Sequence, residues 1–195
     1  MAQLSFSFPQ NENYLEEDFI ILPENSAAKN LLEKFFAQKD FSASQLTSLI
    51  LKGEEACGKT HLLHIYARKK SAQFIDCEKN PADFFSKNNF YILDDADKIK
   101  DDELLLHIVN SASEAKAFLL LSVQNISHFK LRDLVSRLKN IAVAEIKNPS
   151  LESIEQLLAN GFARSQRKVS LAEIRSISKK ISRNYRAISE VINAA

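Results

Sequence analysis

Eight residues in the first third of the chain constrain its fold more than any other segment. A short apolar run is followed there by Gly53-Glu54-Glu55-Ala56-Cys57-Gly58-Lys59-Thr60, and a helix-like stretch comes next. The spacing matches G-x-x-x-x-G-K-[ST] in full, in the strand–loop–helix context that this pattern needs. The chain has only three glycines, and two of them lie in this stretch. Such clustering indicates a backbone that must curl tightly or approach another group closely.

Loops with this spacing bind phosphate groups. Gly53 and Gly58 leave room for backbone N–H groups to surround an anion, and the following helix points the positive end of its dipole at the same place. Lys59 can reach the β- and γ-phosphates of a nucleotide, and Thr60 can ligate Mg²⁺. A chance match in a tight turn is the alternative. The two carboxylates at positions 54 and 55 either point to solvent or weaken nucleotide affinity, because they repel phosphate.

A second motif lies downstream, in Phe90-Tyr91-Ile92-Leu93-Asp94-Asp95. Four apolar residues typical of a strand lead there into two adjacent acids. Asp94, at the strand end, is placed to hold Mg²⁺ through water. A turn that ends the strand would explain the same acids without a ligand, because Asp favours turns. Together with the glycine loop, the pair favours a nucleotide site.

Short apolar runs alternate with amphipathic segments over most of the chain. The runs predict strands at 46–52, 72–76, 89–94, 117–123 and 141–146, and the other segments predict helices at 26–36, 61–70, 102–113 and 131–138. Asn25 or Ser26 would cap the first helix. Nearly continuous apolar strands alternating with helices indicate a parallel sheet covered on both faces. We therefore predict an α/β nucleotide-binding domain, with a five-stranded parallel sheet, over residues 14–148.

The pattern changes at both ends of this domain. After Pro149 the strands stop, and helices are expected at about 150–166, 170–180 and 184–194. We predict that residues 149–195 form a small helical lid. Residues 1–13 are predicted to form a flexible arm, because they lack a helical period and Pro9 ends any strand.

The overall charge provides no field that favours DNA or a membrane. The formal net charge is +1, and the chain is 45% hydrophobic and 26% charged, as in globular proteins. Residues 1–44 carry seven acids and three bases, whereas residues 151–195 carry eight bases and four acids. The basic end can meet phosphates, but a solvated helical face is the more ordinary explanation. We expect no sequence-specific DNA binding.

Cysteine usage and hydropathy point to the cytoplasm. Cys57 and Cys77 lack the spacing of a zinc site and provide no disulfide framework, which suits a reducing compartment. No apolar run is long enough to span a membrane. The start of the chain has neither the basic nor the apolar region of a signal peptide. We expect a cytoplasmic monomer or weak homo-oligomer.

The run Gly58-Lys59-Thr60-His61-Leu62-Leu63-His64 resembles the DnaA family of AAA+ ATPases, whose phosphate loop continues into the same helix. The likeness extends over about residues 14–195. It implies an AAA+ domain that binds ADP or ATP with Mg²⁺ and acts in the initiation of DNA replication. Asp95 then corresponds to the carboxylate that orients the attacking water, and Thr60 and Asp94 to the magnesium site. The resemblance implies a nucleotide site made of Gly53, Cys57, Gly58, Lys59, Thr60, His61, Asp94, Ser122, Gln124 and Arg186.

Three further positions correspond to catalytic or nucleotide-sensing positions of the family. Gln124 follows the fourth predicted strand at the sensor I position, where the family usually has Asp, which argues against fast hydrolysis. Residues 131–138 resemble the segment that supplies an arginine finger in trans, with Arg137 as the matching arginine. Arg186, in Asn184-Tyr185-Arg186, resembles the sensor II arginine that faces the γ-phosphate. An ordinary surface charge is the alternative for each arginine.

The N-terminal residues carry a separate resemblance. Gln3-Leu4-Ser5-Phe6-Ser7-Phe8 is similar to the peptide by which DnaA-like regulators dock on the DNA polymerase III sliding clamp, although Phe6 replaces the usual Leu. An extended arm can lay Leu4, Phe6 and Phe8 into an apolar groove while Gln3 makes directional hydrogen bonds. A disordered tail without a partner is the alternative.

The sequence ends just after the third C-terminal helix, so we expect neither the N-terminal domain of DnaA nor its DNA-reading domain. The resemblance then implies a regulator that binds DnaA and the sliding clamp and stimulates hydrolysis of DnaA-bound ATP. Three alternatives remain open. They are an adaptor without arginine-finger activity, an autonomous ATPase, and a relic of the loop that binds no nucleotide.

Overall fold

A computed structural model describes residues 14–76 and 84–194 of the chain. The clamp-like segment Gln3–Phe8 and Cys77 lie outside the described residues. The elements, in chain order, are η1 (Glu16–Asp18), α1 (Pro23–Phe36), η2 (Phe41–Ala43), β1 (Ser48–Lys52), α2 (Lys59–Lys70), β2 (Gln73–Phe74), β3 (Phe90–Leu93), η4 (Ala96–Lys98), α3 (Asp102–Glu114), β4 (Phe118–Val123), α4 (Arg132–Lys139), β5 (Ala142–Glu145), α5 (Leu151–Arg164), α6 (Leu171–Ser178) and α7 (Tyr185–Ala194).

The strands form one five-stranded sheet in the order β2-β3-β4-β1-β5. All neighbouring strands pair in parallel, and Ile50 of β1 lies between Leu121 of β4 and Val143 of β5. The predicted α/β fold with a five-stranded parallel sheet is therefore confirmed. Because the strands are parallel, their carboxyl ends meet at one edge, and the glycine-containing loop begins there, after β1.

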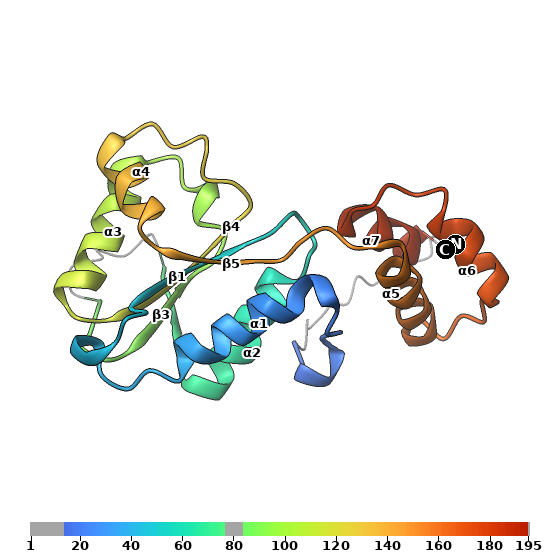
Figure 1. The fold of residues 1–195 in the computed structure, drawn as a ribbon, viewed down its shortest axis with the longest axis horizontal. Helices are drawn as coiled ribbons and strands as arrows, with labels where there is room; N and C mark the ends of the chain where they lie inside the picture. The colour runs from blue at the N-terminus through green and yellow to red at the C-terminus, as the bar shows by residue number, and fades with distance from the viewer. Residues whose placement is uncertain (1–13, 77–83, 195) are drawn as a thin grey trace, which may run out of the picture.

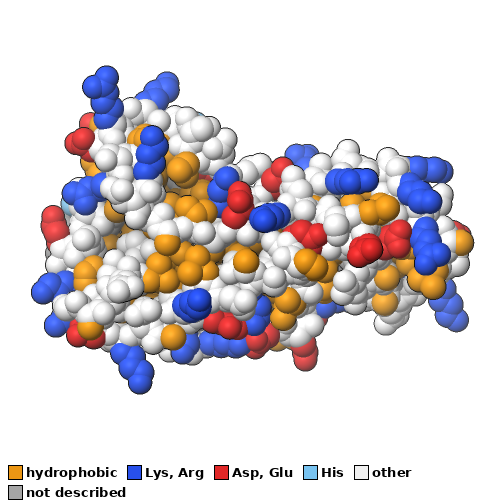
Figure 2. All heavy atoms as spheres, viewed as in Figure 1, with side chains coloured by type: hydrophobic (Ala, Val, Ile, Leu, Met, Phe, Trp, Pro, Cys, Tyr) orange, Lys and Arg blue, Asp and Glu red, His pale blue; other side chains and the backbone are white. Residues whose placement is uncertain are grey.

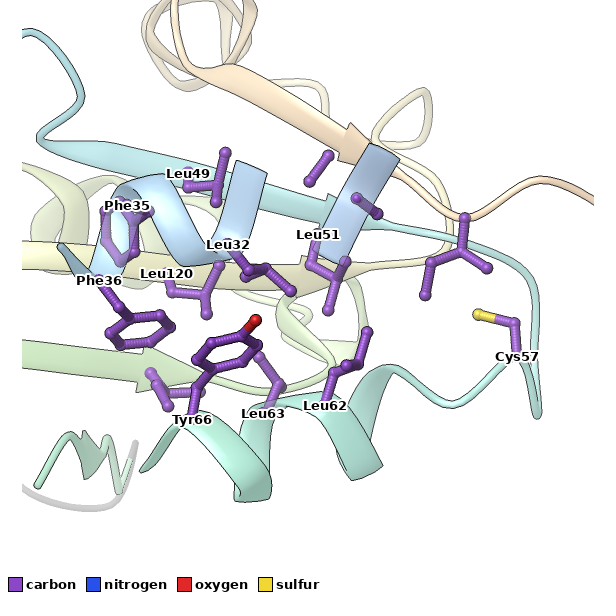
Figure 3. Packing of buried hydrophobic residues seen from close by; sticks show 14 of the residues in the cluster. Leu32, Phe35, Phe36, Leu49, Leu51, Cys57, Leu62, Leu63, Tyr66 and Leu120 are labelled. Atoms are coloured by element: carbon purple, nitrogen blue, oxygen red, sulfur yellow. The ribbon is translucent and has the colours of Figure 1, made fainter. Parts of the chain in front are cut away.

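Helices cover both faces of this sheet (Figure 1), and successive side chains along a strand point to opposite faces. Leu49 and Leu51 of β1 belong to a buried cluster with α1 and α2, whereas Ile50 belongs to a second cluster with α3 and α4. Figure 3 shows the first cluster, in which side chains of α1 and α2 meet those of β1 and β4. Burial on both faces explains why the strands have continuous apolar sequences.

The three C-terminal helices lie at one end of the molecule, beyond the end of β5 (Figure 1). They pack around a separate small cluster of buried residues: Ile154, Leu158, Phe162, Ile174 and Ile188. Helices α5 and α7 approach closely at Gly161, where an added Cβ would lie 2.2 Å from Cδ1 of Ile192.

The start of α1 differs from the prediction. The helix begins at Pro23, so neither Asn25 nor Ser26 is the cap, and that prediction is wrong. Proline is favoured at the first position of a helix because its φ is already helical. The Asn25 side chain instead accepts a hydrogen bond from the Leu22 N–H (2.9 Å) and donates one to the Ile20 carbonyl (2.9 Å). From inside the first turn, this side chain thus provides hydrogen-bond partners for two backbone groups that precede the helix.

Apolar residues are exposed along β5, which is an edge strand. Three of its four residues are exposed, and Val143 retains 46% of its accessible surface. Figure 2 shows hydrophobic side chains gathered over this part of the sheet region, with lysine and arginine side chains mostly toward the periphery. Within the described ranges, no helix is long and apolar enough to cross a membrane.

Candidate nucleotide-binding site

The loop from Gly53 to Thr60 connects the end of β1 with the start of α2 and curls tightly. Gly58 has φ = 92°, in the left-handed region that favours glycine, and a Cβ there would lie 3.0 Å from the ring of Phe19. A Cβ on Gly53 would lie 2.5 Å from Sγ of Cys57. Both glycines are therefore required by the geometry of the loop.

Lys59 lies at the centre of this curl, at the first position of α2. Its Nζ donates hydrogen bonds to the carbonyls of Gly53 (2.9 Å) and Glu54 (3.0 Å), and only 7% of the residue is exposed. A buried ammonium needs such partners. Phosphate oxygens can replace neutral carbonyls in this role, because hydrogen bonds between charged groups are stronger. The geometry fits a lysine that holds the phosphates of a nucleotide.

Asp94 is fixed by two hydroxyl groups at the ends of neighbouring elements. Thr60 Oγ1 donates to one carboxylate oxygen of Asp94 (2.8 Å), and Ser122 Oγ donates to the other. The Asp95 N–H in turn donates to Ser122 Oγ (2.8 Å). The two predicted magnesium ligands, Thr60 and Asp94, thus lie in direct contact, and Ser122 holds Asp94 in place.

A magnesium ion at this position would need further ligands. Within residues 14–76 and 84–194, no group of three or more His, Cys, Asp or Glu side chains could hold a metal ion. Mg²⁺ commonly binds one or two protein oxygens together with phosphates of the substrate and water. The pair Thr60–Asp94 fits that incomplete, ligand-dependent kind of site.

Asp95 has a different environment from its neighbour. Its backbone is in the left-handed region (φ = 50°), and its Oδ2 lies 2.5 Å from Nζ of Lys98. The hydrogen bond to Asp95 and the charge of that carboxylate raise the pKa of Lys98, and Asp97 and Asp94 contribute to the same shift. No sequence pattern indicates this lysine, which lies three residues after Asp95 in the short helix η4.

Most of the predicted nucleotide ligands line one cleft of about 760 Å³. That volume lies within the range of about 300–1,000 Å³ that is usual for ligand pockets. Four predicted ligands are not among the lining residues: Gly53, Asp94, Ser122 and Arg186. Gly53 borders a neighbouring hollow, whereas Asp94 and Ser122 are connected to the cleft by the hydrogen bond from Thr60 to Asp94. Arg186 reaches the cleft only through its ion pair with Glu55. The predicted residues that line the cleft are Cys57, Gly58, Lys59, Thr60, His61, Asp95 and Gln124, joined by Tyr14, Glu55, Ala56, Asp97, Lys98 and Ser189.

A smaller hollow of about 220 Å³ adjoins the cleft, and both are bordered by Ala56, Cys57 and Gly58. Its walls come from the segment before α1, which includes Phe19, and from helices α5 and α7, which include Tyr185. Burial raises the pKa of the Cys57 thiol, although the charge of Lys59 opposes the shift. The mixture of aromatic and polar walls is suited to a flat heterocycle.

The two predicted arginines lie in different surroundings. Arg186 reaches the loop, because its guanidinium pairs with Glu55 (3.2 Å) as well as with Glu190 (3.0 Å). These carboxylates raise the pKa of Arg186, Glu190 most strongly. Arg137 is exposed on α4 and lines neither hollow. Its guanidinium makes no hydrogen bond or ion pair with any described residue.

Polar contacts join α5–α7 to the rest of the molecule around this site. The Glu24 carboxylate accepts hydrogen bonds from the N–H of Ser150 (2.8 Å) and the hydroxyl of Ser153 (2.7 Å), at the start of α5. Arg164 of α5 pairs with Asp18 (3.1 Å). The partners are more than 120 positions apart in the chain, so no local pattern in the sequence indicates them.

Comparison with known proteins identifies solved structures that share this architecture. No protein-family model and no curated protein match the sequence. Solved structures do match. A DNA replication initiation factor has a TM-score of 0.74 and 17% identity, covering 94% of this chain and 64% of its own. Domain III of the replication initiation protein DnaA from Thermotoga maritima has a TM-score of 0.68 and 18% identity, covering 95% of this chain and 88% of its own. The chain has the AAA+ fold.

A third AAA+ structure is that of AMPPCP-bound DnaA from Aquifex aeolicus, with a TM-score of 0.70 and 17% identity. The match covers 94% of this chain and 65% of that DnaA chain. This chain therefore spans less than two thirds of the initiation factor and of the Aquifex protein. At these identities the likeness establishes the AAA+ fold, in which the phosphate loop follows β1.

Proposed function

We propose that the cleft at Lys59 and Thr60 binds an adenine nucleotide together with Mg²⁺. The curled loop, the lysine at its centre and the contact between Thr60 and Asp94 support this proposal. The AMPPCP bound by the similar Aquifex DnaA supports it further. The phosphates would lie along the loop and the base in the smaller hollow beside Phe19 and Tyr185. A magnesium ion held by Thr60 and Asp94 would neutralise phosphate charge.

Titration of the purified protein with ADP and ATP, with and without Mg²⁺, tests nucleotide binding. We expect Lys59→Ala to weaken binding by about 10- to 100-fold, because one charge-assisted hydrogen-bonding group is lost. Lys70→Ala is the matched control, because this exposed lysine lies at the far end of the same helix. If the wild-type protein binds neither nucleotide, the loop is a relic and this proposal is wrong.

We further infer that the chain is a regulator of replication initiation that resembles Hda, the regulatory inactivator of DnaA. In this proposal residues 14–148 bind the nucleotide, residues 149–195 act as the lid, and the arm at 1–13 docks on the sliding clamp through Gln3–Phe8. The regulator then stimulates hydrolysis of ATP bound to DnaA. One observation carries the inference: Arg137 is exposed, lacks a partner among the described residues, and lies outside the chain's own cleft.

An arginine in this position is available to a second molecule. A finger delivered in trans neutralises charge that develops on the transferred phosphoryl group and can contribute about 10³–10⁵ in rate. Arg186, in contrast, already pairs with the chain's own loop through Glu55. The two arginines would thus serve different sites, Arg137 that of DnaA and Arg186 the chain's own.

Turnover of DnaA-bound ATP, measured with clamp loaded on DNA, tests the finger. We expect Arg137→Ala to abolish the stimulation while nucleotide binding is kept. Arg132→Ala provides the control, because Arg132 is also exposed on α4. Normal stimulation by the Arg137 variant would refute the finger assignment. If the wild-type protein binds DnaA and the clamp without stimulating turnover, the chain is an adaptor.

A clamp pull-down tests the arm separately. The variant with Gln3→Ala and Leu4→Ala should lose the clamp, whereas Asn11→Ala should retain it, because only the former changes the clamp-like peptide. Retention of the clamp by both variants would contradict the assignment of residues 3–8.

The fixed arrangement of Thr60, Asp94 and Ser122 favours one second candidate, an autonomous ATPase. Such an enzyme would hydrolyse ATP without DnaA or clamp, and Asp95→Asn would remove that activity. Turnover by the isolated protein distinguishes the two functions.

A further inference from the structure

The contact between Asp95 and Lys98 follows from the local backbone. Residues 96–98 form the short 3₁₀ helix η4, and the Lys98 N–H donates to the Asp95 carbonyl (2.8 Å). Side chains three positions apart eclipse each other in this geometry. The ammonium of Lys98 therefore lies directly against the Asp95 carboxylate, at 2.5 Å.

The other acids at this point of the cleft are already engaged. Asp94 accepts from Thr60 and Ser122. Asp97 accepts from the N–H groups of Gln124 (2.9 Å) and Asn125 (3.2 Å). These carboxylates hold the fold together. Asp95 differs, because Lys98 is the only side chain in the described part of the protein that makes a hydrogen bond or an ion pair with its carboxylate.

The position of Asp95 does not depend on this lysine. Its N–H is held by Ser122 and by Asp94, and its carboxylate projects from a left-handed turn. The Lys98 side chain is 78% exposed and lines the same cleft as Lys59 and Thr60. Removing the ammonium should therefore remove a positive charge and a hydrogen bond from beside the Asp95 carboxylate without moving the turn.

We propose that Lys98 restrains ATP hydrolysis in the chain's own cleft, because it occupies an oxygen of Asp95 that would otherwise orient the attacking water. The inference rests on the proposed nucleotide binding. In the reaction, the water oxygen bonds to the terminal phosphorus while the bond from that phosphorus to the bridging oxygen breaks. The diphosphate leaves with the bridging oxygen, and the protons of the water end on the phosphate product and in solvent. Lys98 is a positioning residue that acts through Asp95.

Intrinsic turnover of Lys98→Ala tests this role. We expect kcat to rise by about two- to five-fold, the range expected when one exposed ion pair is lost. The KM for ATP and the Kd for ADP should stay unchanged. Lys98→Arg should keep the slow rate, because it restores the cation. Lys100→Ala is the matched control, since this nearby exposed lysine makes no ion pair within the described residues.

The salt dependence of turnover provides an independent test, because exposed ion pairs are screened at high ionic strength. Turnover of the wild-type protein should rise with salt toward that of Lys98→Ala, while the variant responds less. Equal, lower or absent turnover in Lys98→Ala overturns the proposal. So does a loss of ATP affinity with ADP affinity kept, which would assign Lys98 to the terminal phosphate. If the wild-type protein binds no nucleotide, the proposed function fails as well, whereas normal binding with unchanged turnover rejects only the role of Lys98.

Discussion

The sheet with helices α1–α4 and the three C-terminal helices are held together in different ways. Two extensive buried clusters, one on each face, stabilise the sheet region. Helices α5–α7 pack around only five buried residues. Several polar contacts join the two regions: Glu24 with Ser150 and Ser153, Arg164 with Asp18, Tyr185 with Lys147, and Arg186 with Glu55. Apolar packing contributes as well, because Tyr185 of α7 belongs to the first buried cluster and Leu157 of α5 packs against it.

This difference has a physical consequence for the site between them. Burial of apolar surface depends little on salt or on moderate changes in pH, whereas ion pairs and ionised hydrogen bonds depend on both. The loop and the Asp94 cluster belong to the first region and are held rigidly. The position of α5–α7 depends in addition on ionised groups, including Glu24 of α1 and Glu55 in the loop.

The largest effect is expected from core truncation. Leu120→Ala, at a residue fully buried in the central part of the sheet, should lower the free energy of global unfolding by about 2–5 kcal/mol. Leu158→Ala, at a fully buried residue of α5, should mainly promote local opening of α5–α7. Denaturant unfolding measures the first, and hydrogen exchange resolved along the chain measures the second.

Leu171→Ala is the control for both, because Leu171 is 70% exposed at the start of α6. If Leu158→Ala reduces protection in β1 and β4 as much as in α5, the two regions unfold as one unit and the comparison is wrong.

An intermediate effect is expected at Glu24. Glu24→Ala removes the acceptor for the hydrogen bonds at the start of α5 and should cost about 1–2 kcal/mol in the stability of the α5–α7 region. Glu152→Ala is the control, since Glu152 is an exposed acid in the first turn of the same helix. Equal losses in the two variants would show that a general helix-dipole effect is responsible.

The pH dependence of the Glu24 effect has a definite sign. Burial by itself would raise the pKa of this carboxyl, but hydrogen bonds from Ser153 and Ser150 outweigh it and lower the pKa. A carboxyl with a lower pKa in the folded protein stabilises the fold when ionised. The contribution is complete above the ordinary glutamate pKa of about 4.3 and is lost as the pH falls through the lower value of the folded protein. The difference between wild type and Glu24→Ala should shrink accordingly in acid.

The smallest effect is expected at the ion pair between Arg186 and Glu55, whose side chains are each 65% exposed. Arg186→Ala should change the free energy of unfolding by less than about 1 kcal/mol, and the difference should disappear at high salt. Arg183→Ala, at an exposed residue in the turn before α7, is the control. A larger effect that persists in high salt would show that this contact is structural.

The sequence predicted the elements of the sheet region well, because burial produces apolar patterns along each element and the loop has a fixed local spacing of residues. The continuous apolar run of β4 reflects burial on both faces, with all six residues buried. The G-x-x-x-x-G-K-[ST] spacing predicted the loop because the positions of Gly53 and Gly58 are imposed by steric contacts. The predicted strand at 72–76 is shorter in the structure: Gln73 and Phe74 have ladder partners in β3, and Ile75 adds one backbone hydrogen bond to Ile92.

The features that the sequence did not indicate arise from contacts between distant segments or from short irregular turns. Glu24 and Ser153 are 129 positions apart. The contact between Asp95 and Lys98 depends on a single 3₁₀ turn, which is too short to produce a periodic pattern. The pair of Arg186 with Glu55 joins residues 131 positions apart, so only the tertiary structure brings them together.

The chain of hydroxyl contacts from Ser122 through Asp94 to Thr60 connects three elements at one point. Ser122 belongs to β4, the middle strand of the sheet, and Thr60 lies in the first turn of α2. Because Ser122 is fully buried, this chain of hydrogen bonds ties the first turn of α2 directly to the interior of the sheet.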